Sequence, residues 1–423
     1  MTKIYIETAG CSLNQSDSEV MNGLLKKAGF VTVGNAEESD LVILNTCTVK
    51  GPTEAKFWKR LAELRNLRKQ IIVAGCIAQT EPEELKEFSL IGTTQINNIV
   101  SVVEETINDN IVKLIAFEKN NRISLPKVSK NKVVSIVPIS SGCLGEPCTY
   151  CKVKQARGDL VSYDKDAIIK EVSKAVVHGA KEIWLTSQDN GCYGKDINSS
   201  FPELLKEVLK INGSFRLRIG MMNPNHAKEF IDELIQILKH DKIFKFIHLP
   251  VQSGNNEILK LMKRKYTVEE FKQIADRLRR EIPGITIATD IICGFPTETE
   301  EQFQDSIQLV RDIKPDVLNR SRFWPRPGTP AASMEGQIHG QETKRRCTLL
   351  SDIFTNIKMI ENERWIGWKG EVLIDERGKD NTWVGRNYAY RPIILEGNLN
   401  LGDIVNARVE KRTVHDLRGV LIR

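Results

Sequence analysis

Cys143, Cys148 and Cys151 lie close together just after the apolar run 133–139, which predicts a strand. Three thiolates at such spacing can bind three irons of a 4Fe–4S cube and leave the fourth iron open to a substrate. A zinc site would need a fourth Cys or His nearby, and the next histidine is His178. Zinc binding and simple packing remain the alternatives, but the spacing favours a cluster that performs chemistry.

Three further cysteines, Cys11, Cys47 and Cys76, are far apart in sequence but each follows a predicted strand. The strands are Lys3–Thr8, Leu41–Leu44 and Ile71–Ala74. The carboxyl ends of parallel strands line one crevice of an open α/β sheet, so these thiols should converge in space. A second three-thiolate cluster is one interpretation, and the burial of small apolar side chains is the other.

The remaining cysteines, Cys192, Cys293 and Cys347, have no partners at ligand spacing and are expected to be packing residues. An odd total of nine cysteines, without a signal-peptide pattern, argues against a disulfide framework. No apolar run reaches membrane-spanning length, and the net charge is a mild +6. We therefore expect a cytoplasmic protein that does not enter a membrane.

The elements that must position these cysteines fall into three α/β or β units. Residues 1–110 alternate apolar strands with helical patterns such as 53–68, which predicts a doubly wound α/β domain. Residues 133–360 repeat strand and helix about six times, which predicts a partial (β/α)6 barrel. The expected strands are 134–139, 182–186, 215–220, 244–248, 286–292 and 317–323.

Two further segments lie before and after the predicted partial barrel. The segment 119–132 carries five basic and no acidic residues and reads as a solvated linker, with phosphate contact as a weaker interpretation. A polar helix over 341–363 leads to residues 361–423, where short alternating strands such as 370–374 and 404–409 predict a small antiparallel β-barrel.

The segment 143–151, the barrel repeat and the trio Cys11, Cys47 and Cys76 resemble the radical S-adenosylmethionine methylthiotransferases, over essentially the whole chain, and two segments resemble one branch of them. Cys-Thr-Tyr-Cys-Lys-Val-Lys-Gln-Ala-Arg-Gly (148–158) and Trp-Ile-Gly-Trp-Lys-Gly-Glu-Val-Leu-Ile-Asp (365–375) resemble the archaeal and eukaryotic branch of the radical S-adenosylmethionine methylthiotransferases. The resemblance implies an N-terminal methylthiotransferase domain (1–110), a radical core (133–360) and a C-terminal TRAM domain (361–423). That branch adds a methylthio group to C2 of N6-threonylcarbamoyladenosine at position 37 of tRNA.

The resemblance also implies the cofactors, which are two 4Fe–4S clusters and S-adenosylmethionine. Cys143, Cys148 and Cys151 would hold the cluster that generates a radical, and the three upstream cysteines would hold the cluster that carries sulfur. No catalytic residue beyond these cluster ligands is implied. The expected S-adenosylmethionine contacts are Gln188, Asp189, Gln252 and Ser253. A polar turn at 188–189 and a helix cap at 252–253 are the simpler alternatives.

The implied partners are the tRNA anticodon loop, a protein that supplies electrons and a source of sulfide. Arg320, Arg322 and Arg326 are expected to reach phosphates or the bound nucleotide, or else to lie in a solvated loop. On the C-terminal barrel, aromatic side chains either stack on splayed bases or form the core. The expected surface contacts there are Trp383, Arg386, Tyr388 and Arg391.

One detail departs from the family pattern. The family usually spaces its radical cysteines C-x-x-x-C-x-x-C, whereas here one more residue separates Cys143 from Cys148. Gly145 and Pro147 lie in the longer gap and would let the loop bulge.

Other functions are compatible with part of the same sequence pattern. Relatives that modify another tRNA adenosine or a ribosomal-protein aspartate would use the same cluster cysteines. A different class is a non-catalytic, metal-containing RNA-binding protein.

Overall fold

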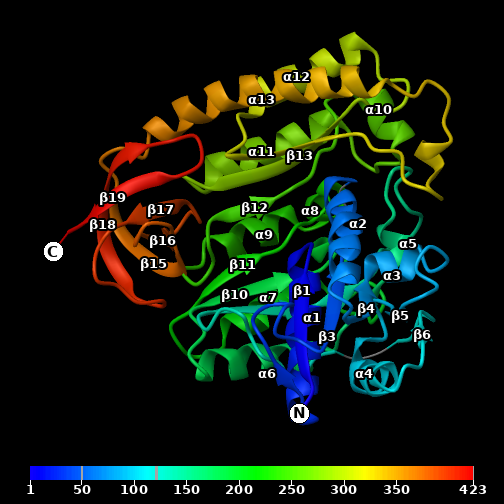
Figure 1. Cartoon of the computed structure of the whole chain (residues 1–423). Helices are drawn as coiled ribbons and strands as arrows, with labels where there is room; N and C mark the ends of the chain where they lie inside the picture. Colours follow the sequence, from blue (N-terminus) through cyan, green and yellow to red (C-terminus); the bar gives the residue numbers. More distant parts are fainter. Residues whose placement is uncertain (49–50, 120–121, 423) are drawn as a thin grey trace.

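A computed structural model of the chain describes residues 1–48, 51–119 and 122–422, including all of their side chains except those of residues 51 and 52. Three units follow one another along the chain (Figure 1). An N-terminal α/β domain lies against one side of a central α/β domain, and a small β-barrel lies at the other side. The predicted fold class, with its three kinds of unit, is confirmed.

The N-terminal domain is built on a six-stranded parallel sheet with the order β2-β1-β3-β4-β5-β6. The direction of winding reverses between β1 and β3, as in other doubly wound folds. Every residue of β3 is buried, as expected for a parallel strand covered on both faces. The strands are β1 (Lys3–Thr8), β2 (Val31–Thr32), β3 (Leu41–Thr46), β4 (Gln70–Gly75), β5 (Ser89–Ile91) and β6 (Lys113–Leu114). The helices are α1 (Ser12–Lys27), α2 (Gly51–Asn66), α3 (Cys76–Thr80), α4 (Ile99–Ile107) and the 3-10 turn η1 (Ile96–Asn98).

The segment after this domain packs along α1 instead of standing in solvent. Arg122 is 5% exposed and pairs with Asp17 of α1, with 2.5 Å between Nη1 and Oδ1. Lys127 pairs with Glu19 of the same helix, and Val128 donates its backbone N–H to the Glu19 carbonyl. The prediction of a solvated linker over 119–132 is therefore wrong for this part, because buried acids on α1 supply partners that sequence proximity does not reveal.

The central domain holds six parallel strands in two sheets, β11-β10-β7 and β12-β13-β14. A parallel bridge between Leu217 and Ile243 continues the array from one sheet to the other. The strands form an open, partial barrel as predicted, with helices on its outer face (Figure 1). The strands are β7 (Val134–Pro138), β10 (Glu182–Thr186), β11 (Arg216–Ile219), β12 (Phe246–His248), β13 (Thr286–Cys293) and β14 (Val317–Arg322).

Local signals in the sequence fix several helices of this domain. Three of them begin with a capping box, in which a Ser or Thr hydroxyl and a Glu or Gln side chain satisfy backbone N–H groups reciprocally. The boxes are Ser200 with Glu203, Thr267 with Glu270 and Thr299 with Gln302. The helices are α6 (Lys165–Val177), α7 (Phe201–Leu209), α8 (Pro224–Glu229), α9 (Ile231–Leu238), α10 (Asn256–Leu261), α11 (Val268–Glu281), α12 (Glu300–Ile313) and α13 (Gly340–Glu363). The remaining short elements are α5 (Val153–Arg157), β8 (Ser140–Ser141), β9 (Val161–Ser162), η2 (Asn190–Cys192) and η3 (Pro330–Ala332).

The last unit is a closed five-stranded barrel with the order β15-β16-β17-β19-β18. Its pairs are antiparallel as predicted, except that β17 and β19 pair in parallel. Trp365 is only 3% exposed and belongs to the barrel core, so part of the aromatic content serves packing. The strands are β15 (Lys369–Arg377), β16 (Trp383–Arg386), β17 (Pro392–Leu395), β18 (Ile404–Arg412) and β19 (Leu417–Leu421).

The C-terminal barrel docks at the amino ends of the central strands. The Thr286 hydroxyl, at the start of β13, donates to the Ala389 carbonyl (2.7 Å), and Lys245, just before β12, donates its backbone N–H to the Tyr388 carbonyl (2.7 Å). Arg391 pairs with Asp316, which immediately precedes β14. The carboxyl ends of the same strands face away from this barrel.

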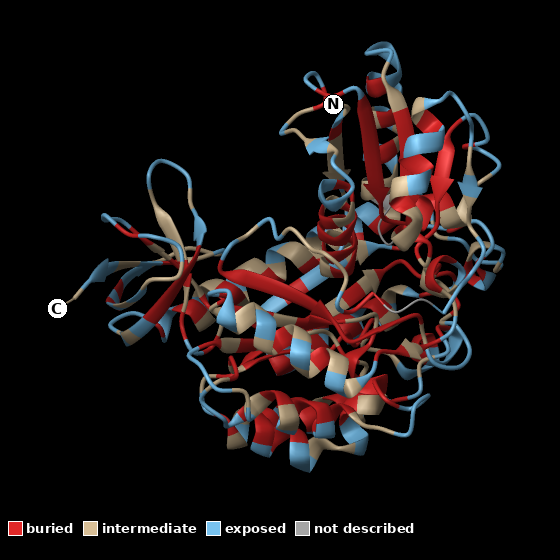
Figure 2. Ribbon diagram, turned by 90° about the horizontal axis from the view of Figure 1, so that it is seen from below, coloured by how far each residue is buried: buried red, intermediate tan, exposed pale blue. Residues whose placement is uncertain are grey.

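The N-terminal domain docks at those carboxyl ends. The hydroxyls of Ser12 and Thr186, which is the last residue of β10, lie 2.6 Å apart. The Thr93 hydroxyl donates to the Ala156 carbonyl of α5 at 2.6 Å. Figure 2 shows buried residues along the strands of both domains and exposed residues on the outer faces of the helices. Within the described ranges, none of the helices combines the length and the apolar character that a membrane span requires.

Candidate active site

The structure brings Cys11, Cys47 and Cys76, here called the N-terminal trio, to one edge of the N-terminal sheet. Cys11 caps α1, Cys47 follows β3, and Cys76 opens α3 directly after β4. Cys47 and Cys76 are buried, whereas Cys11 is exposed. The predicted convergence of the three strand ends therefore occurs.

Asn14 ties the three loops of this trio together, and sequence reasoning did not identify it. Its Oδ1 lies 3.7 Å from the Cys11 Sγ and 4.0 Å from the Cys76 Sγ. Its Nδ2 donates to the carbonyls of Ala9 (3.2 Å), in the loop of Cys11, and of Thr46 (2.6 Å), just before Cys47. One amide at the start of α1 thus holds the sheet edge in a single arrangement. No feature of an Asn three residues after a Cys signals this role.

Cys143, Cys148 and Cys151, here called the central trio, lie in the loop between β8 and α5. All three line a cavity of about 130 Å³. The backbone of Cys143 is fixed by hydrogen bonds with Gly158 and Leu160, and Cys151 donates its N–H to the Cys148 carbonyl at 3.0 Å. The loop that contains the additional residue turns at Gly145, where φ is +70°, a value that favours glycine. The longer spacing therefore still leaves the three thiols on one cavity.

Burial governs the protonation of the central thiols. It raises the pKa of Cys151 to about 11, reinforced by the neighbouring Cys148, and it raises the pKa of Cys143 well above its usual value. Such thiols ionise when a cation binds, because metal binding releases the proton. Two N–H donors already point at sulfur atoms of the central trio. The Val153 N–H lies 3.4 Å from the Cys151 Sγ, and the Arg264 Nη1 lies 3.2 Å from the Cys148 Sγ.

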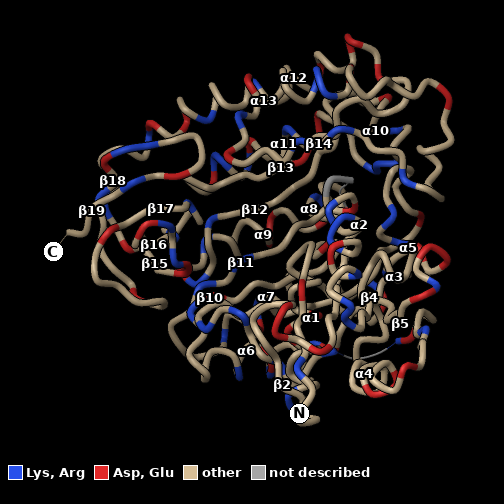
Figure 3. Tube along the Cα trace, viewed as in Figure 1, with Lys and Arg blue, Asp and Glu red and all other residues tan. Residues whose placement is uncertain are grey.

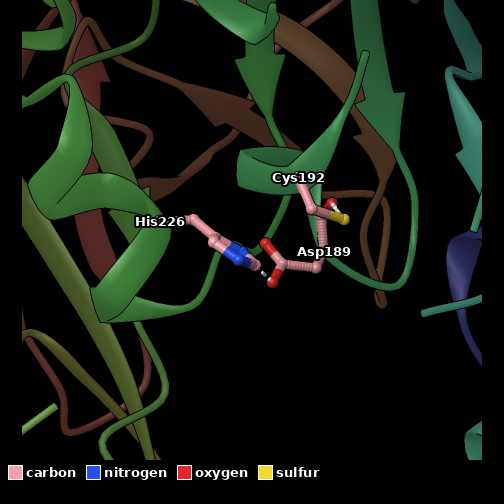
Figure 4. A group of neighbouring side chains, drawn as sticks. All are labelled: Asp189, Cys192 and His226. Carbon is pink, nitrogen blue, oxygen red and sulfur yellow. Dashed lines mark hydrogen bonds and ion pairs between the residues drawn. The ribbon is translucent and has the colours of Figure 1, made fainter. Parts of the chain in front are cut away.

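Asp189 lies on the wall of the same cavity, in a hydrogen-bonded group with His226 and Cys192 (Figure 4). Its carboxylate is 2.8 Å from the His226 Nδ1 and also accepts from the backbone N–H groups of Gly191 (3.0 Å) and Asn223 (3.1 Å). The ligand atoms of Asp189, Cys192 and His226 lie within 4.8 Å of one another, which a metal ion could use.

The chemistry of this group favours a structural wall over a metal site. The Asp189 carboxylate already has several donors, and Cys192 donates its S–H to the Asp189 carbonyl at 3.1 Å. Burial, followed by the Asp189 charge, raises the pKa of Cys192 far above its usual value, so its thiol stays protonated. We interpret Cys192 as a packing residue that supports the Asp189 side of the cavity.

Of the other expected S-adenosylmethionine contacts, all of which the structure describes, only Gln188 lines the cysteine cavity. Gln188 lines the cavity, and its Oε1 accepts the Gly142 N–H at 2.8 Å, next to Cys143. Gln252 is buried with φ at +75°, and its backbone pairs with Asp290 and Ile292. The Ser253 hydroxyl accepts the Asn255 N–H at 3.2 Å, in the manner of a turn. Gln188 and Asp189 therefore meet the cysteine cavity, whereas Gln252 and Ser253 are not among the described residues that line it.

A buried arginine lies between the two trios. Arg326, in the loop after β14, is 5% exposed, and its Nη1 lies 2.7 Å from the Glu54 Oε2 of α2. Burial lowers the pKa of Arg326, while Glu54, Cys47 and Cys151 counteract the shift. Its guanidinium therefore interacts electrostatically with one cysteine of each trio, Cys47 and Cys151. The alternative of a solvated loop is wrong for Arg326, because its side chain is enclosed between the two domains, and its contact with the bound nucleotide stays a prediction.

The other expected RNA contacts divide by exposure. Arg320 and Arg322 are exposed on β14. Both lie near Cys347, whose pKa is lowered to about 7, first by a hydrogen bond with Cys293 and then by these two charges. Two of the three cysteines expected only to pack, Cys293 and Cys347, are therefore neighbours, which their separation in sequence concealed.

On the C-terminal barrel, Arg391 is 3% exposed and holds Asp316 at 3.2 Å. The expectation of a surface contact is wrong for Arg391, because it docks the barrel on the central domain. Tyr388 is exposed, and Trp383 and Arg386 are half-buried, so these three remain predictions for RNA contact. Figure 3 shows that basic and acidic residues alternate on this barrel, so charge does not single out one face.

Comparison with known proteins assigns the three units. Residues 3–93 match the model of "Uncharacterized protein family UPF0004", residues 137–310 that of the radical SAM superfamily, and residues 365–422 that of the TRAM domain. A radical S-adenosylmethionine methyltransferase, TsrM, from Kitasatospora setae has a similar fold, with a TM-score of 0.57 at 16% identity over 78% of this chain and 75% of its own. The chain is thus a radical S-adenosylmethionine protein with two additional domains.

Close relatives define the family more narrowly. The chain is 43% identical to a probable threonylcarbamoyladenosine tRNA methylthiotransferase of Pyrococcus horikoshii, over 100% of both chains. It is 41% identical to the threonylcarbamoyladenosine tRNA methylthiotransferase of Homo sapiens, over 99% of this chain and 73% of that one. It belongs to this family of threonylcarbamoyladenosine tRNA methylthiotransferases.

Radical S-adenosylmethionine folds imply one 4Fe–4S cluster and S-adenosylmethionine as cofactors. The central trio fits the cluster, because three free thiols and two N–H donors to sulfur converge on one cavity. The three matched ranges fall inside the predicted domains 1–110, 133–360 and 361–423, whose boundaries stay a prediction.

Proposed function

We propose that this protein transfers a methylthio group to C2 of N6-threonylcarbamoyladenosine at position 37 of tRNA. The observation that carries the proposal is the identity of 41–43% with archaeal and human relatives of that name over essentially the whole chain. The TRAM match supports an RNA substrate.

In this proposal the central trio holds a 4Fe–4S cluster, with S-adenosylmethionine beside Gln188 and Asp189. When bound, these cofactors supply a deoxyadenosyl radical, which can remove hydrogen from a carbon that no side-chain base can deprotonate. The chain's own residues hold the cofactors in position and keep the wall of the cavity fixed. Arg264 donates to the Cys148 sulfur, and the buried wall of Asp189 and His226 keeps one side of the cavity fixed.

The N-terminal trio would hold a second 4Fe–4S cluster, which carries the sulfur to be transferred. The support is geometric, because three free thiols meet at a strand edge that packs on the carboxyl ends of the central strands. The target adenine would leave its stack and enter between the two domains, near Arg326. A cluster at each side would then place sulfur and radical on the two sides of one base.

The reaction needs partners that lie outside this chain. A reductant protein would deliver electrons to the central site, and a sulfide source would supply the N-terminal site. We place the reaction in the cytoplasm, because six of the nine cysteines are proposed ligands that oxidation would disable.

Mass spectrometry of tRNA nucleosides tests the substrate. Cells that lack the gene should accumulate threonylcarbamoyladenosine and lose its methylthio derivative, and the gene should restore it. Unchanged levels of both nucleosides would overturn the substrate assignment. A gain of unmodified isopentenyladenosine, or of unmodified aspartate in a ribosomal protein, would instead identify one of the rival substrates.

Anaerobic reconstitution tests the cofactors. The protein should bind about eight irons per chain, and Cys11→Ala should still cleave S-adenosylmethionine while failing to insert sulfur. About four irons or fewer, or zinc in their place, would refute the two-cluster proposal. Binding of tRNA without any conversion of S-adenosylmethionine would favour a non-catalytic RNA-binding protein.

A further inference from the structure

Arg157 ends α5, the helix that follows the central trio, yet its side chain reaches the N-terminal trio. The Nη2 donates to the Asn14 Oδ1 at 2.6 Å and to the Asp17 Oδ2 at 3.0 Å. The Asn14 Oδ1 is the same oxygen that lies beside the sulfurs of Cys11 and Cys76. The side chain is 2% exposed, so this guanidinium is sealed between the two domains.

The charges around Arg157 do not cancel. Asp17 is 2% exposed and already pairs with Arg122, whose side chain is 3% exposed. Two buried guanidiniums therefore share one carboxylate, and among the described residues this group carries one excess positive charge next to the thiols of Cys11 and Cys76. A buried charge without a partner is costly, so this excess needs an anion nearby.

One donor of Arg157 remains available for that anion. Its Nη1 is buried and has no hydrogen-bond partner at normal geometry among the described residues. An arginine guanidinium cannot be deprotonated in a protein. The guanidinium is thus permanently charged, clamped on one side by Asp17 and Asn14, and its other side faces the Cys76 thiol.

We propose that Arg157 is a positioning residue of the N-terminal trio, which directs its excess charge and its unsatisfied N–H at an anionic sulfur held there, of the hydrosulfide class. This inference rests on the proposed second cluster, whose open iron would take the sulfur. Hydrogen bonds and charge beside cluster sulfurs also raise the reduction potential, so Arg157 should affect the cluster even without added sulfide.

The experiment uses the full chain with Cys143, Cys148 and Cys151 changed to Ala, so that only the N-terminal trio can bind iron. After reconstitution and removal of free sulfide, sodium hydrosulfide is titrated, and binding is followed by absorption and electron paramagnetic resonance. The reduction potential is measured in parallel. The variants are Arg157→Gln and Arg157→Lys, and the control is Arg122→Gln, which removes a buried charge from the same Asp17 but leaves the Nη1 of Arg157 in place.

We expect R157Q to keep about four irons, to bind hydrosulfide at least tenfold more weakly and to show a lower reduction potential. R157K should lie between R157Q and the parent, because it retains charge without the planar fork. R122Q removes the same unit of charge but leaves the Arg157 Nη1 in place, so it should weaken hydrosulfide binding by a smaller factor than R157Q does.

Equal hydrosulfide affinity and equal potential in R157Q and the parent would overturn the inference. If R157Q does not fold, R157K decides, because parent-like affinity and potential in R157K would overturn it as well. Failure of the parent background to bind iron is a different result. It would refute the second cluster itself and with it the proposed function of the N-terminal trio.

Discussion

Gly10 decides how closely two loops of the N-terminal trio can approach each other. Its φ is +131°, and a Cβ at this position would lie 2.6 Å from the Cys47 Cβ and 3.1 Å from the Cys47 Sγ. Both the backbone conformation and the space therefore demand glycine. Asn14 acts from the other side, because its amide joins the strand ends through Ala9 and Thr46. The geometry of the N-terminal trio thus depends on two residues that do not belong to it.

Gly10→Ala should destabilise the fold and displace Cys47. Backbone strain at such a φ costs about 1–3 kcal/mol, and the overlap with Cys47 adds to it. We expect a lower free energy of unfolding in urea and a loss of up to half of the bound iron after reconstitution. Gly29→Ala is the matched control, because Gly29 has φ at +91° but nothing within 4 Å of a Cβ. Its free energy of unfolding should fall by about 1 kcal/mol, and it should retain its iron. Full iron content in G10A would mean that this contact does not set the trio.

At the scale of elements, the sequence predicts those parts that depend on local periodicity. The continuous apolar run of β3 and the strand-end positions of Cys11, Cys47 and Cys76 follow from the rules for parallel sheets. Capping residues locate helix starts equally well.

The supports of the two cysteine sites could not be predicted in the same way. Arg157 meets Asp17 and Arg326 meets Glu54 across more than a hundred residues, so no local pattern encodes either pair. The same difficulty explains why Arg122, Arg326 and Arg391 were expected in solvent. A basic residue in a sequence gives no sign of a buried acid elsewhere, and each of these arginines is buried against one.

The pair of Arg326 and Glu54 connects the loop after β14 with α2 and should hold the two domains together. Their side chains are 6% and 20% exposed, so removal of one partner leaves a poorly solvated charge. Arg326→Gln should lower the free energy of unfolding by about 2–4 kcal/mol. Arg60→Gln breaks a pair whose two side chains are both 30% exposed, and it should cost less than about 1 kcal/mol.

Adding Glu54→Gln to R326Q should recover part of that loss, because the unpaired carboxylate is then removed. Urea denaturation of the four proteins measures these values. Equal, small losses in R326Q and R60Q would show that the Arg326 pair does not connect the domains.

At the scale of the whole molecule, the two added domains occupy opposite ends of the central strands. The junction with the C-terminal barrel contains a buried acid pair, Glu182 and Asp375. Burial, followed by the charge of Asp375, raises the pKa of Glu182 to about 7 from an ordinary value of 4.5. The pKa of Asp375 is raised as well, chiefly by burial. Arg386 lies 2.9 Å from Asp375 and offsets only part of this cost.

Stability at this junction should therefore fall with rising pH. A carboxyl group whose pKa is raised on folding stabilises the folded state fully below its unfolded pKa, near 4.5, and this contribution is lost as the pH rises through about 7. Glu182→Gln mimics the protonated acid, so it should match the parent at pH 4 and exceed it by about 1–3 kcal/mol at pH 8. Urea denaturation at both pH values measures this, with the exposed Glu371→Gln as control. If the parent had the higher free energy of unfolding at pH 8, the predicted direction of the pH dependence would be contradicted.

The same arrangement separates the reacting base from the C-terminal barrel. The barrel docks at the start of β13 and the cysteine sites lie beyond its end, and an eight-residue strand spans about 25 Å. Side chains of the barrel can then contact RNA only at a distance from position 37. Trp383 and the cation Arg377, which lies 5.7 Å from its ring centre, are suited to such a contact. We therefore expect the barrel to hold the tRNA body instead of the bases beside the target.

Arg377→Gln combined with Lys379→Gln should weaken binding of full-length tRNA about three- to tenfold and reduce the salt dependence of binding. Both side chains are exposed, so the fold should be preserved. An isolated anticodon stem-loop should bind the variant and the parent equally, because it reaches the cysteine sites but not the barrel. Lys272→Gln and Arg311→Gln, which remove two charges from the outer helices α11 and α12, serve as the matched control. Equal weakening for stem-loop and full-length tRNA would place the barrel next to the target base and contradict the separation that the strands impose.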